Sequence, residues 1–245
     1  MRWKTSDCHR GNIDAPVAST ATRPTTITTL NVAGFLSIVE KQRQAGTVLS
    51  GHDAQGPADI ALLQEVKVSH RQDTTHLAHG PVTALSADDC QQLASNVNPG
   101  GRSWWTPYCA IILAPHTDST PATVQEALDG RVLCLSYEDL TIVNIYSPAN
   151  GAERKRFFVQ LTEVLALLPG TNDNLLVAGD WNLVPDPAQV FDWLHGNPQR
   201  RDVGRPELES LLEELGQNTR GAWSATRTVT TTSMILTRPA TLSSK

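Results

Sequence analysis

The sequence predicts an α/β (α+β) protein built as a layered sandwich of two mixed β-sheets flanked by helices. Three observations predict this class. Short apolar runs of β-type residues recur along the chain, two of them lie close enough to form a hairpin, and few stretches between them have helical periodicity. A doubly wound parallel sheet needs a crossover helix between most of its strands, so mixed sheets fit the sequence better.

Six runs of apolar and β-branched residues are predicted to form strands. The run TITTLN at residues 26–31 alternates β-branched and polar residues, whereas IALLQE at residues 60–65 is a short apolar run that ends in charge. Residues 132–137 and 141–146 are separated by only three residues, which is short enough for a hairpin. The remaining predicted strands cover residues 108–114 and 175–179.

Two helices are predicted from apolar residues that recur along one helical face. One stripe runs between residues 157 and 168 and is stopped by Pro169 and Gly170. The other runs from Leu208 to Leu215, with Pro206 at its first turn and Gly216 at its end. Weaker helical patterns occur at residues 35–44 and near 88–95.

The chain divides into three regions. Residues 1–24 mix Ser, Thr, Pro and charged residues without periodicity, which predicts a flexible leader. Residues 25–216 carry the predicted strands and helices and are expected to form one domain. Residues 217–245 are rich in Thr and Ser and contain four basic residues and no acidic one, so we expect an irregular basic tail with one strand at most.

Composition excludes several classes of protein. With 40% hydrophobic and 18% charged residues the chain can bury a core, and a net charge of −5 argues against a protein whose whole surface binds nucleic acid. No run reaches the roughly 18 apolar residues of a membrane span, and the N-terminus has no apolar secretory stretch. The four scattered cysteines form no C-x-x-C pair. We therefore expect an intracellular protein with reduced thiols and no membrane association.

Polar side chains follow or end four of the predicted strands. They are Asn31 after TITTL, Glu65 after IALLQ, Asn144 and Tyr146 within TIVNIYSPAN, and Asp180 and Asn182 in GDWN. Strand ends deliver side chains to a common rim of a sheet, where ligand sites often form. Two carboxylates with carboxamides suit a hard divalent cation such as Mg²⁺, which prefers oxygen ligands.

Each of these residues also has a plain structural explanation. A carboxylate at the end of a strand is usually a solvated turn residue or a helix cap, and Asn before a loop usually forms a turn. Trp104 and Trp105, in a Gly-rich segment, could stack on bases but more often pack under a loop. Arg154 could contact a phosphate, or could cap the solvent face of its helix. Only the joint order of the motifs favours a site.

That order resembles the endonuclease/exonuclease/phosphatase family, which includes DNase I-like nucleases. The matching blocks are TLNVAG, LLQEVK, NIYSPAN with Arg154 and FF downstream, and LLVAGDWNLVPDP, over roughly residues 26–215. Within the family the blocks are closest to the endonuclease domains of LINE-type retrotransposons. The resemblance implies a DNase I-like fold and hydrolysis of phosphodiester bonds in DNA with Mg²⁺ or Mn²⁺ as cofactor.

The resemblance also implies a role for each matching residue. Asn31 and Glu65 would bind the metal, and Tyr146 would contact the scissile phosphate. Asp180 would align or deprotonate the attacking water, and Asn182 would donate a hydrogen bond to a phosphate oxygen. Two further residues are expected to bind substrate, namely Asn144 and Arg154.

One expected element is absent from the sequence. Members of the family complete the site with a Ser-Asp-His element near the C-terminal end of the domain, together with one or two further strands. Of the histidines, only His195 lies downstream of Asp180, and no Ser-Asp precedes it. We therefore expect an incomplete domain that lacks its last strand or strands, and hypothesise a truncated or frame-altered copy without activity.

Three functions remain open at this point, because fold alone cannot separate them. The first is a metal-dependent DNA endonuclease of retrotransposon type, or its inactive remnant. The second is a phosphomonoesterase or phospholipid phosphodiesterase of the same fold, and the third is a non-catalytic remnant that binds nucleic acid or protein. DNA is the expected partner, the chain is expected to be a monomer, and a retrotransposon origin would place it in the nucleus.

Overall fold

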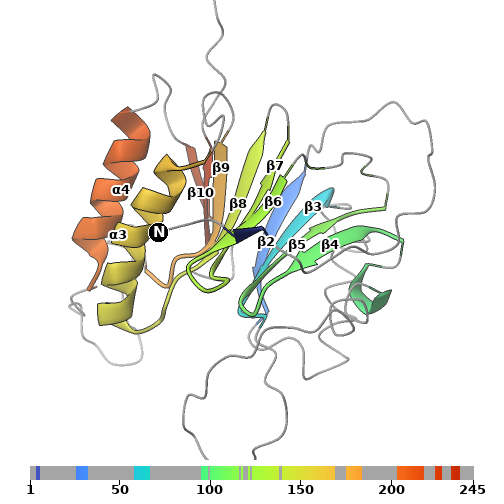
Figure 1. Cartoon of the computed structure of the whole chain (residues 1–245), viewed down its shortest axis with the longest axis horizontal. Helices are drawn as coiled ribbons and strands as arrows, with labels where there is room; N and C mark the ends of the chain where they lie inside the picture. The colour runs from blue at the N-terminus through green and yellow to red at the C-terminus, as the bar shows by residue number, and fades with distance from the viewer. Residues whose placement is uncertain are drawn as a thin grey trace, which may run out of the picture.

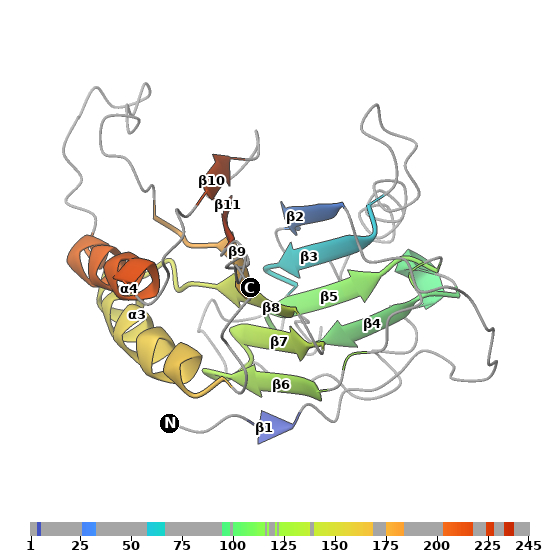
Figure 2. The same cartoon turned by 90° about the horizontal axis from the view of Figure 1, so that it is seen from above.

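The computed structural model shows two β-sheets packed face to face, with two helices on the outer face of the larger sheet (Figures 1 and 2). The fold class predicted from the sequence is confirmed. The residues that the structure describes are 4–5, 26–32, 58–66, 95–98, 100–115, 117, 121, 123–137, 140–168, 175–183, 203–217, 224–227 and 233–237. None of the helices among these residues has the length and apolar character needed to cross a membrane.

The larger sheet joins seven of the described strands in the order β1-β6-β7-β8-β9-β11-β10. All neighbours in it are antiparallel except β8 and β9. The predicted hairpin is confirmed, because β7 pairs antiparallel with β8 from Val132↔Ile145 to Ser136↔Thr141. The strand bounds are β1 Lys4–Thr5, β6 Thr123–Ala127, β7 Val132–Ser136, β8 Thr141–Tyr146, β9 Leu175–Asp180, β10 Ser224–Arg227 and β11 Ser233–Thr237.

The smaller sheet has the order β2-β3-β5-β4 and is also mixed. Strands β2 and β3 are parallel, whereas β5 runs antiparallel to both β3 and β4. The bounds are β2 Ile27–Asn31, β3 Ile60–Gln64, β4 Arg102–Trp105 and β5 Cys109–Leu113. Each sheet therefore contains one parallel pair, and these two pairs carry the candidate site.

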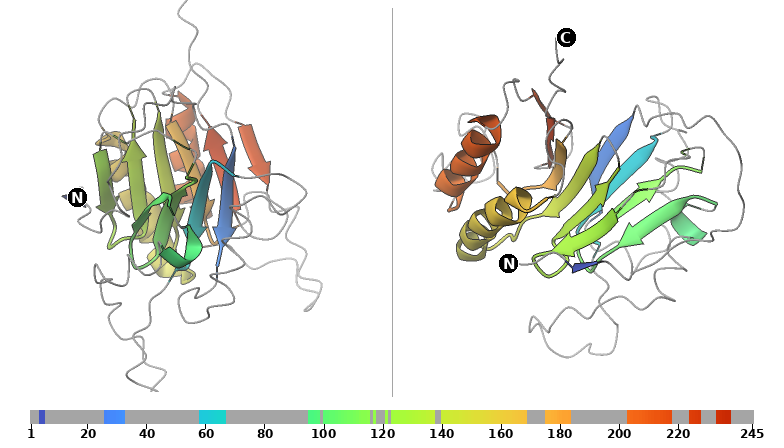
Figure 3. Two further views of the ribbon diagram at one scale, coloured as in Figure 1. Left: turned by 90° about the vertical axis from the view of Figure 1, so that its right-hand side faces the viewer. Right: turned by 45° about the horizontal axis from the view of Figure 1, so that its top comes forward.

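Three apolar layers hold these elements together. Between the sheets, Leu62 and Ile111 of the smaller sheet pack with Leu135 and Ile142 of the larger one. On the outer face of the larger sheet, the apolar stripe of α3 (Gly151–Ala166) packs on β7, β8 and β9 together with residues of α4 (Arg205–Gln217). Figure 3 shows both helices on that side of the molecule. A third cluster covers the outer face of the smaller sheet and includes Trp105.

Both predicted helices are present, and local sequence explains where they lie. Asn150 caps α3, because its side chain accepts hydrogen bonds from the backbone N–H groups of Ala152 and Glu153. The predicted apolar stripe is buried along α3, from Phe157 to Leu165. The weaker helical pattern at residues 35–44 lies outside the described residues, as does most of the one near 88–95.

Two strands within the predicted domain, β4 and β6, were misjudged or not predicted from the sequence. The segment with Trp104 and Trp105 was expected to be a loop, but it forms β4, and both indole rings are buried rather than available to bases. The Nε1–H of Trp105 donates to Ser103 Oγ at 2.8 Å. Strand β6 escaped prediction because its sequence, TVQEA, is polar and mostly half-buried.

The two ends of the chain also differ from expectation. Beyond residue 216 the structure forms two strands, not one at most, and β11 pairs with β9 from Ser233↔Asp180 to Thr237↔Leu176. The edge of β9 is therefore covered, and the described residues of this region, 224–227 and 233–237, form strands. Within the expected leader, Lys4–Thr5 form β1 and pair with β6.

Candidate active site

The two parallel strand pairs bring four of the candidate residues to strand ends. In the larger sheet Tyr146 and Asp180, the last residues of β8 and β9, stand opposite each other in the register. In the smaller sheet Asn31, the last residue of β2, pairs with Gln64, and Glu65 follows directly after β3. Because parallel strands end at the same edge, each pair presents its polar residues on one side.

A hydrogen bond between side chains joins these two edges. The Nδ2 of Asn31 donates to Asp180 Oδ2 at 2.5 Å, although the two residues are 149 positions apart in the chain. The other carboxylate oxygen, Oδ1, accepts from the backbone N–H of Asn182 at 2.8 Å. Asp180 is only 2% exposed, and its hydrogen bonds with Asn31 and Asn182 hold the carboxylate in one orientation.

Asn182 and Glu65 share an unusual backbone conformation. Their φ angles are +45° and +58°, in the left-handed region that residues other than glycine seldom adopt. Asn182 is fixed there by its Nδ2, which donates to the carbonyl oxygen of Ser147 at 2.7 Å. Residues held in such conformations cluster at functional sites, because surrounding contacts must stabilise them.

Tyr146 lies at the centre of these groups. The pKa of its phenol is raised to about 12, first by burial and then by the negative charges of Glu65 and Asp180, against the lowering effect of Arg131 and of a hydrogen bond with the Asn182 side chain. The phenol is therefore protonated at neutral pH and can donate a hydrogen bond. Since both carboxylates act on this one phenol, Glu65 and Asp180 lie on the same side of the molecule.

Arg131 is a site residue that the sequence did not reveal. Its guanidinium carbon lies 4.0 Å from the centroid of the Tyr108 ring and 5.4 Å from that of Tyr146, and these two rings stack at 5.9 Å. Its Nη1 also donates to the carbonyl oxygen of Tyr146 at 3.4 Å. A signal existed in the predicted hairpin, because pairing Val132 with Ile145 places Arg131 beside Tyr146.

Asn144, which was expected to bind substrate, is completely buried between the sheets. Its Nδ2 donates to the carbonyl oxygens of Leu63 at 2.9 Å and Ala110 at 2.8 Å, and its Oδ1 accepts from Gln64 Nε2 at 2.8 Å. The amide therefore joins β8 to β3 and β5 and is turned away from any surface.

Arg154 donates to backbone carbonyl oxygens, which corrects the expectation that it caps the solvent face of its helix, while its contact with a substrate phosphate stays a prediction. It is 8% exposed, so it does not cap a solvent face. Its Nε donates to the carbonyl oxygen of Val203 at 3.0 Å, and its Nη1 to that of Ala149 at 3.1 Å. The guanidinium stabilises the junction of α3 with the segment before α4.

The comparisons with known proteins identify the family of the chain. A model of the Endonuclease/Exonuclease/phosphatase family matches residues 28–238, which is most of the chain and includes β10 and β11. The chain belongs to this family. Its resemblance to the Endonuclease/Exonuclease/phosphatase family, first suggested by the four sequence blocks, is thus confirmed.

The individual proteins that the chain resembles have low sequence identity to it. Over 90 residues the chain is 27% identical to a DNA-(apurinic or apyrimidinic site) endonuclease of Plasmodium berghei (strain Anka), a match that covers 32% of this chain and 17% of that protein. An AP endonuclease structure from Archaeoglobus fulgidus aligns with a TM-score of 0.52 and 17% identity, covering 87% of this chain and 86% of the other. The cytolethal distending toxin of Haemophilus ducreyi aligns with a TM-score of 0.50 and 14% identity over 89% and 84%. These structures share the fold.

The donor set of the candidate site fits a hard divalent cation. Within the described ranges no three His, Cys, Asp or Glu side chains gather closely enough to form a metal cluster by themselves. The site instead offers the carboxylate of Glu65 and the side-chain amide oxygen of Asn31, with the Asp180 carboxylate hydrogen-bonded to Asn31. Mg²⁺ commonly uses one or two carboxylates and completes its shell with water and phosphate oxygens, so this smaller set suffices. His195 lies outside the described residues.

Proposed function

We propose that the chain hydrolyses phosphodiester bonds of DNA in a reaction that requires Mg²⁺ or Mn²⁺. One observation carries this proposal. Groups suited to metal binding, water activation and phosphate contact converge from the ends of both sheets, joined by the bond between Asn31 and Asp180 and by the shared effect of Glu65 and Asp180 on Tyr146. Members of the family generally depend on a divalent metal, which supports the choice of cofactor.

Each residue takes a role that its surroundings favour. The carboxylate of Glu65 and the side-chain Oδ1 of Asn31 would hold the cation. The cation would stabilise charge on the phosphate oxygens and lower the pKa of bound water. Asp180, held by two donors, accepts the proton of the attacking water, since each carboxylate oxygen can accept more than one hydrogen bond. The protonated phenol of Tyr146 and the side chain of Asn182 contact the phosphate.

DNA is the substrate class that the comparisons favour. Experiments can test whether the substrate is intact DNA or DNA with apurinic or apyrimidinic sites. The curated relative acts on apurinic or apyrimidinic sites, according to its name, whereas the sequence blocks favour a retrotransposon-type endonuclease acting on intact DNA. We propose intact DNA as the substrate. Supercoiled plasmid, the same plasmid after partial depurination, and p-nitrophenyl phosphate separate these two activities from a phosphomonoesterase.

Asp180→Asn tests the proposal directly. This change keeps the shape of the side chain and removes the proton acceptor, so plasmid nicking in Mg²⁺ should fall by about 100-fold or more. Glu163→Gln, a matched change on the exposed face of α3, should leave nicking unchanged. Equal nicking by wild type and Asp180→Asn would refute the assignment.

A second candidate is a protein that keeps the metal site and binds nucleic acid without cleaving it. The observation that favours it is that both carboxylate oxygens of Asp180 already accept hydrogen bonds within the protein, from Asn31 Nδ2 and from the backbone N–H of Asn182. Mg²⁺ would then raise the melting temperature, and Glu65→Ala would remove the effect, although no substrate is cleaved. A cation at about 100 times its Kd stabilises the fold by about 2.7 kcal/mol, which is readily measured.

A further inference from the structure

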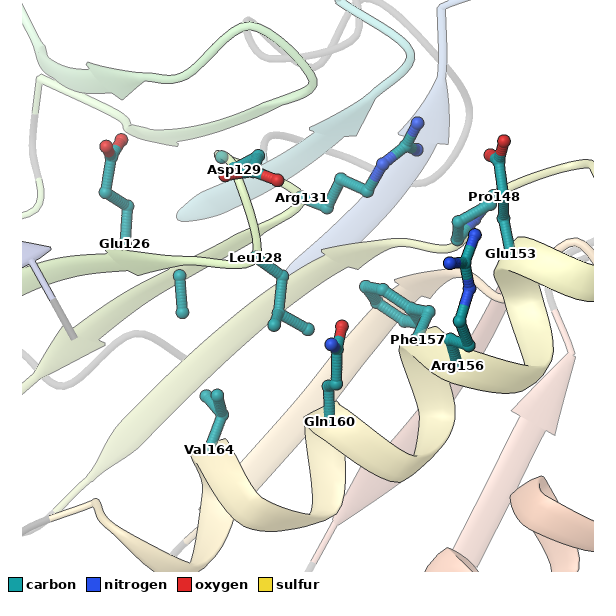
Figure 4. A pocket seen from close by; sticks show the side chains of 12 residues that line it. Glu126, Leu128, Asp129, Arg131, Pro148, Glu153, Arg156, Phe157, Gln160 and Val164 are labelled. Atoms are coloured by element: carbon teal, nitrogen blue, oxygen red, sulfur yellow. The ribbon is translucent and has the colours of Figure 1, made fainter. Parts of the chain in front are cut away.

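A pocket of about 370 Å³ lies beside the candidate active site, between the turn that joins β6 to β7 and one face of α3 (Figure 4). The turn contributes Leu128 and Asp129, and α3 contributes Arg156, Phe157 and Gln160. None of the residues assigned to metal, water or phosphate lines it. The pocket is therefore a separate feature that the proposed reaction does not use.

Arg131 connects this pocket to the site. It lines the pocket, and its guanidinium also lies over the rings of Tyr108 and Tyr146. Pro148, two residues after Tyr146, lines the pocket as well. A strand whose phosphate contacts Tyr146 would therefore place a neighbouring nucleotide at the mouth of the pocket.

The lining chemistry favours an uncharged planar ligand over a phosphate. The apolar part is formed by Leu128, Phe157 and Val164. Around it stand two guanidinium groups, the Gln160 amide, and three carboxylates, those of Glu126, Asp129 and Glu153. Because carboxylates outnumber guanidiniums, a phosphate gains little there. A nucleobase, with its apolar faces and an edge of alternating donors and acceptors, can use all of these groups.

The wall of the pocket is built before any ligand binds. Leu128 and Asp129 have φ angles of +52° and +56° and are followed by Gly130 at +80°. Leucine seldom adopts this conformation, and the turn is fixed by Thr106 Oγ1, which donates to the carbonyl oxygen of Gly130 at 2.6 Å. A Cβ at Gly130 would lie 2.8 Å from Pro107 Cδ, so this wall is closely packed. Preformed walls lower the cost of ordering a ligand.

We propose that this pocket holds the base and sugar of the nucleotide next to the scissile phosphate, and so makes the protein select a DNA strand over small phosphoesters. The assignment of the scissile phosphate to Tyr146 rests on the proposed function. Occupancy of the pocket by a nucleoside is a separate statement that binding measurements can test without cleavage.

The test compares two pocket variants with a matched control. Arg156→Ala and Gln160→Leu each remove polar groups of the pocket, whereas Lys155→Ala removes a positive charge from the same helix at a residue that pairs with Glu207 and does not line the pocket. The Kd of a fluorescein-labelled 12-base-pair DNA is measured by anisotropy in Mg²⁺, with Asp180→Asn present in every protein to prevent cleavage. We expect a Kd about 3–10-fold higher for each pocket variant and a change below about twofold for the control.

Two further readings separate a nucleoside from a phosphate contact. Gln160→Leu should leave the slope of log Kd against log salt unchanged, because it removes no phosphate contact. In the background with Asp180 intact, both pocket variants should hydrolyse bis(p-nitrophenyl) phosphate with unchanged kcat/KM, since this ester has no nucleoside.

The outcomes distinguish the two proposals. Wild-type affinity in both pocket variants, an equal loss in Lys155→Ala, or no binding of DNA at all would overturn the pocket assignment. If no substrate is cleaved but Arg156→Ala and Gln160→Leu still weaken binding selectively, the proposed hydrolysis fails and the pocket assignment stands.

Discussion

Replacing Asn144 by leucine tests how the two sheets are held together. The side chain reaches from β8 to the smaller sheet and makes three hydrogen bonds there, to Leu63, Ala110 and Gln64. Leucine has nearly the same shape and fills the same space. The substitution therefore removes the polar contacts between the sheets without opening a large cavity.

The expected loss of stability follows from those three bonds. Each contributes about 1 kcal/mol net, and each buried group left without a partner costs about 1–3 kcal/mol. Burial of the leucine side chain offsets roughly 1.5–3 kcal/mol of this. We expect the free energy of unfolding to fall by about 3–5 kcal/mol, a large part of the roughly 5–15 kcal/mol typical of a folded domain.

Urea unfolding followed by tryptophan fluorescence measures this change. The control is Asn150→Ala, which removes an exposed asparagine that caps α3 and should cost only about 1 kcal/mol. A loss for Asn144→Leu no larger than that of the control would refute the inter-sheet role. The double variant with Gln64→Leu should lose less stability than the sum of the two single changes, because each single change already removes the hydrogen bond between Gln64 and Asn144.

Three other substitutions test the structure at separate places. The wild-type melting temperature should fall between pH 10 and 12, because the tyrosine pKa is about 12 in the folded state and near 10 in the unfolded chain. Tyr146→Phe removes this ionisable group, so its melting temperature should fall less over the same range. The same decline in both proteins would contradict this. Gly179→Ala should cost well over about 3 kcal/mol and abolish soluble expression, because its φ is +140° and the added Cβ would lie 2.0 Å from the Ile145 carbonyl oxygen. Phe158→Ala should cost about 3–5 kcal/mol in chemical unfolding, because the ring is fully buried against Trp181, whereas Val159→Ala beside it, at a side chain 49% exposed, should change stability by less than about 0.5 kcal/mol.

Where a run of sequence was both apolar and bounded, its structure could be predicted. Residues 141–146 form β8 over the predicted range, and the stripe from Phe157 onward forms the buried face of α3. A strand with a polar sequence could not be found in this way. β6 has the sequence TVQEA, and its pattern is too polar to mark a strand before its neighbours are known.

Asn31 and Asn144 show why most of the candidate site could be predicted from the sequence and part of it could not. Both are asparagines in strands with apolar neighbours, and both looked equally suited to a ligand site. Asn31 is the last residue of β2, so it reaches the rim, whereas all six residues of β8 are buried. Which side of β8 faces the second sheet depends on long-range packing, and the local alternation of residues does not show it. The same holds for Arg154, whose partner Val203 lies 49 positions away.

The candidate site is itself a product of the packing between sheets. Asn31 comes from the smaller sheet and Asp180 from the larger. The pKa of Tyr146 is raised by Glu65, which follows a strand of the smaller sheet, and by Asp180. A slight shift of one sheet against the other would separate these groups while leaving each sheet and its hydrogen bonds intact. Loss of the Asn144 contacts should therefore weaken the metal-dependent rise in melting temperature even in protein that is still folded. On this prediction, the buried amide of Asn144 supports both the stability of the fold and the geometry of the candidate site.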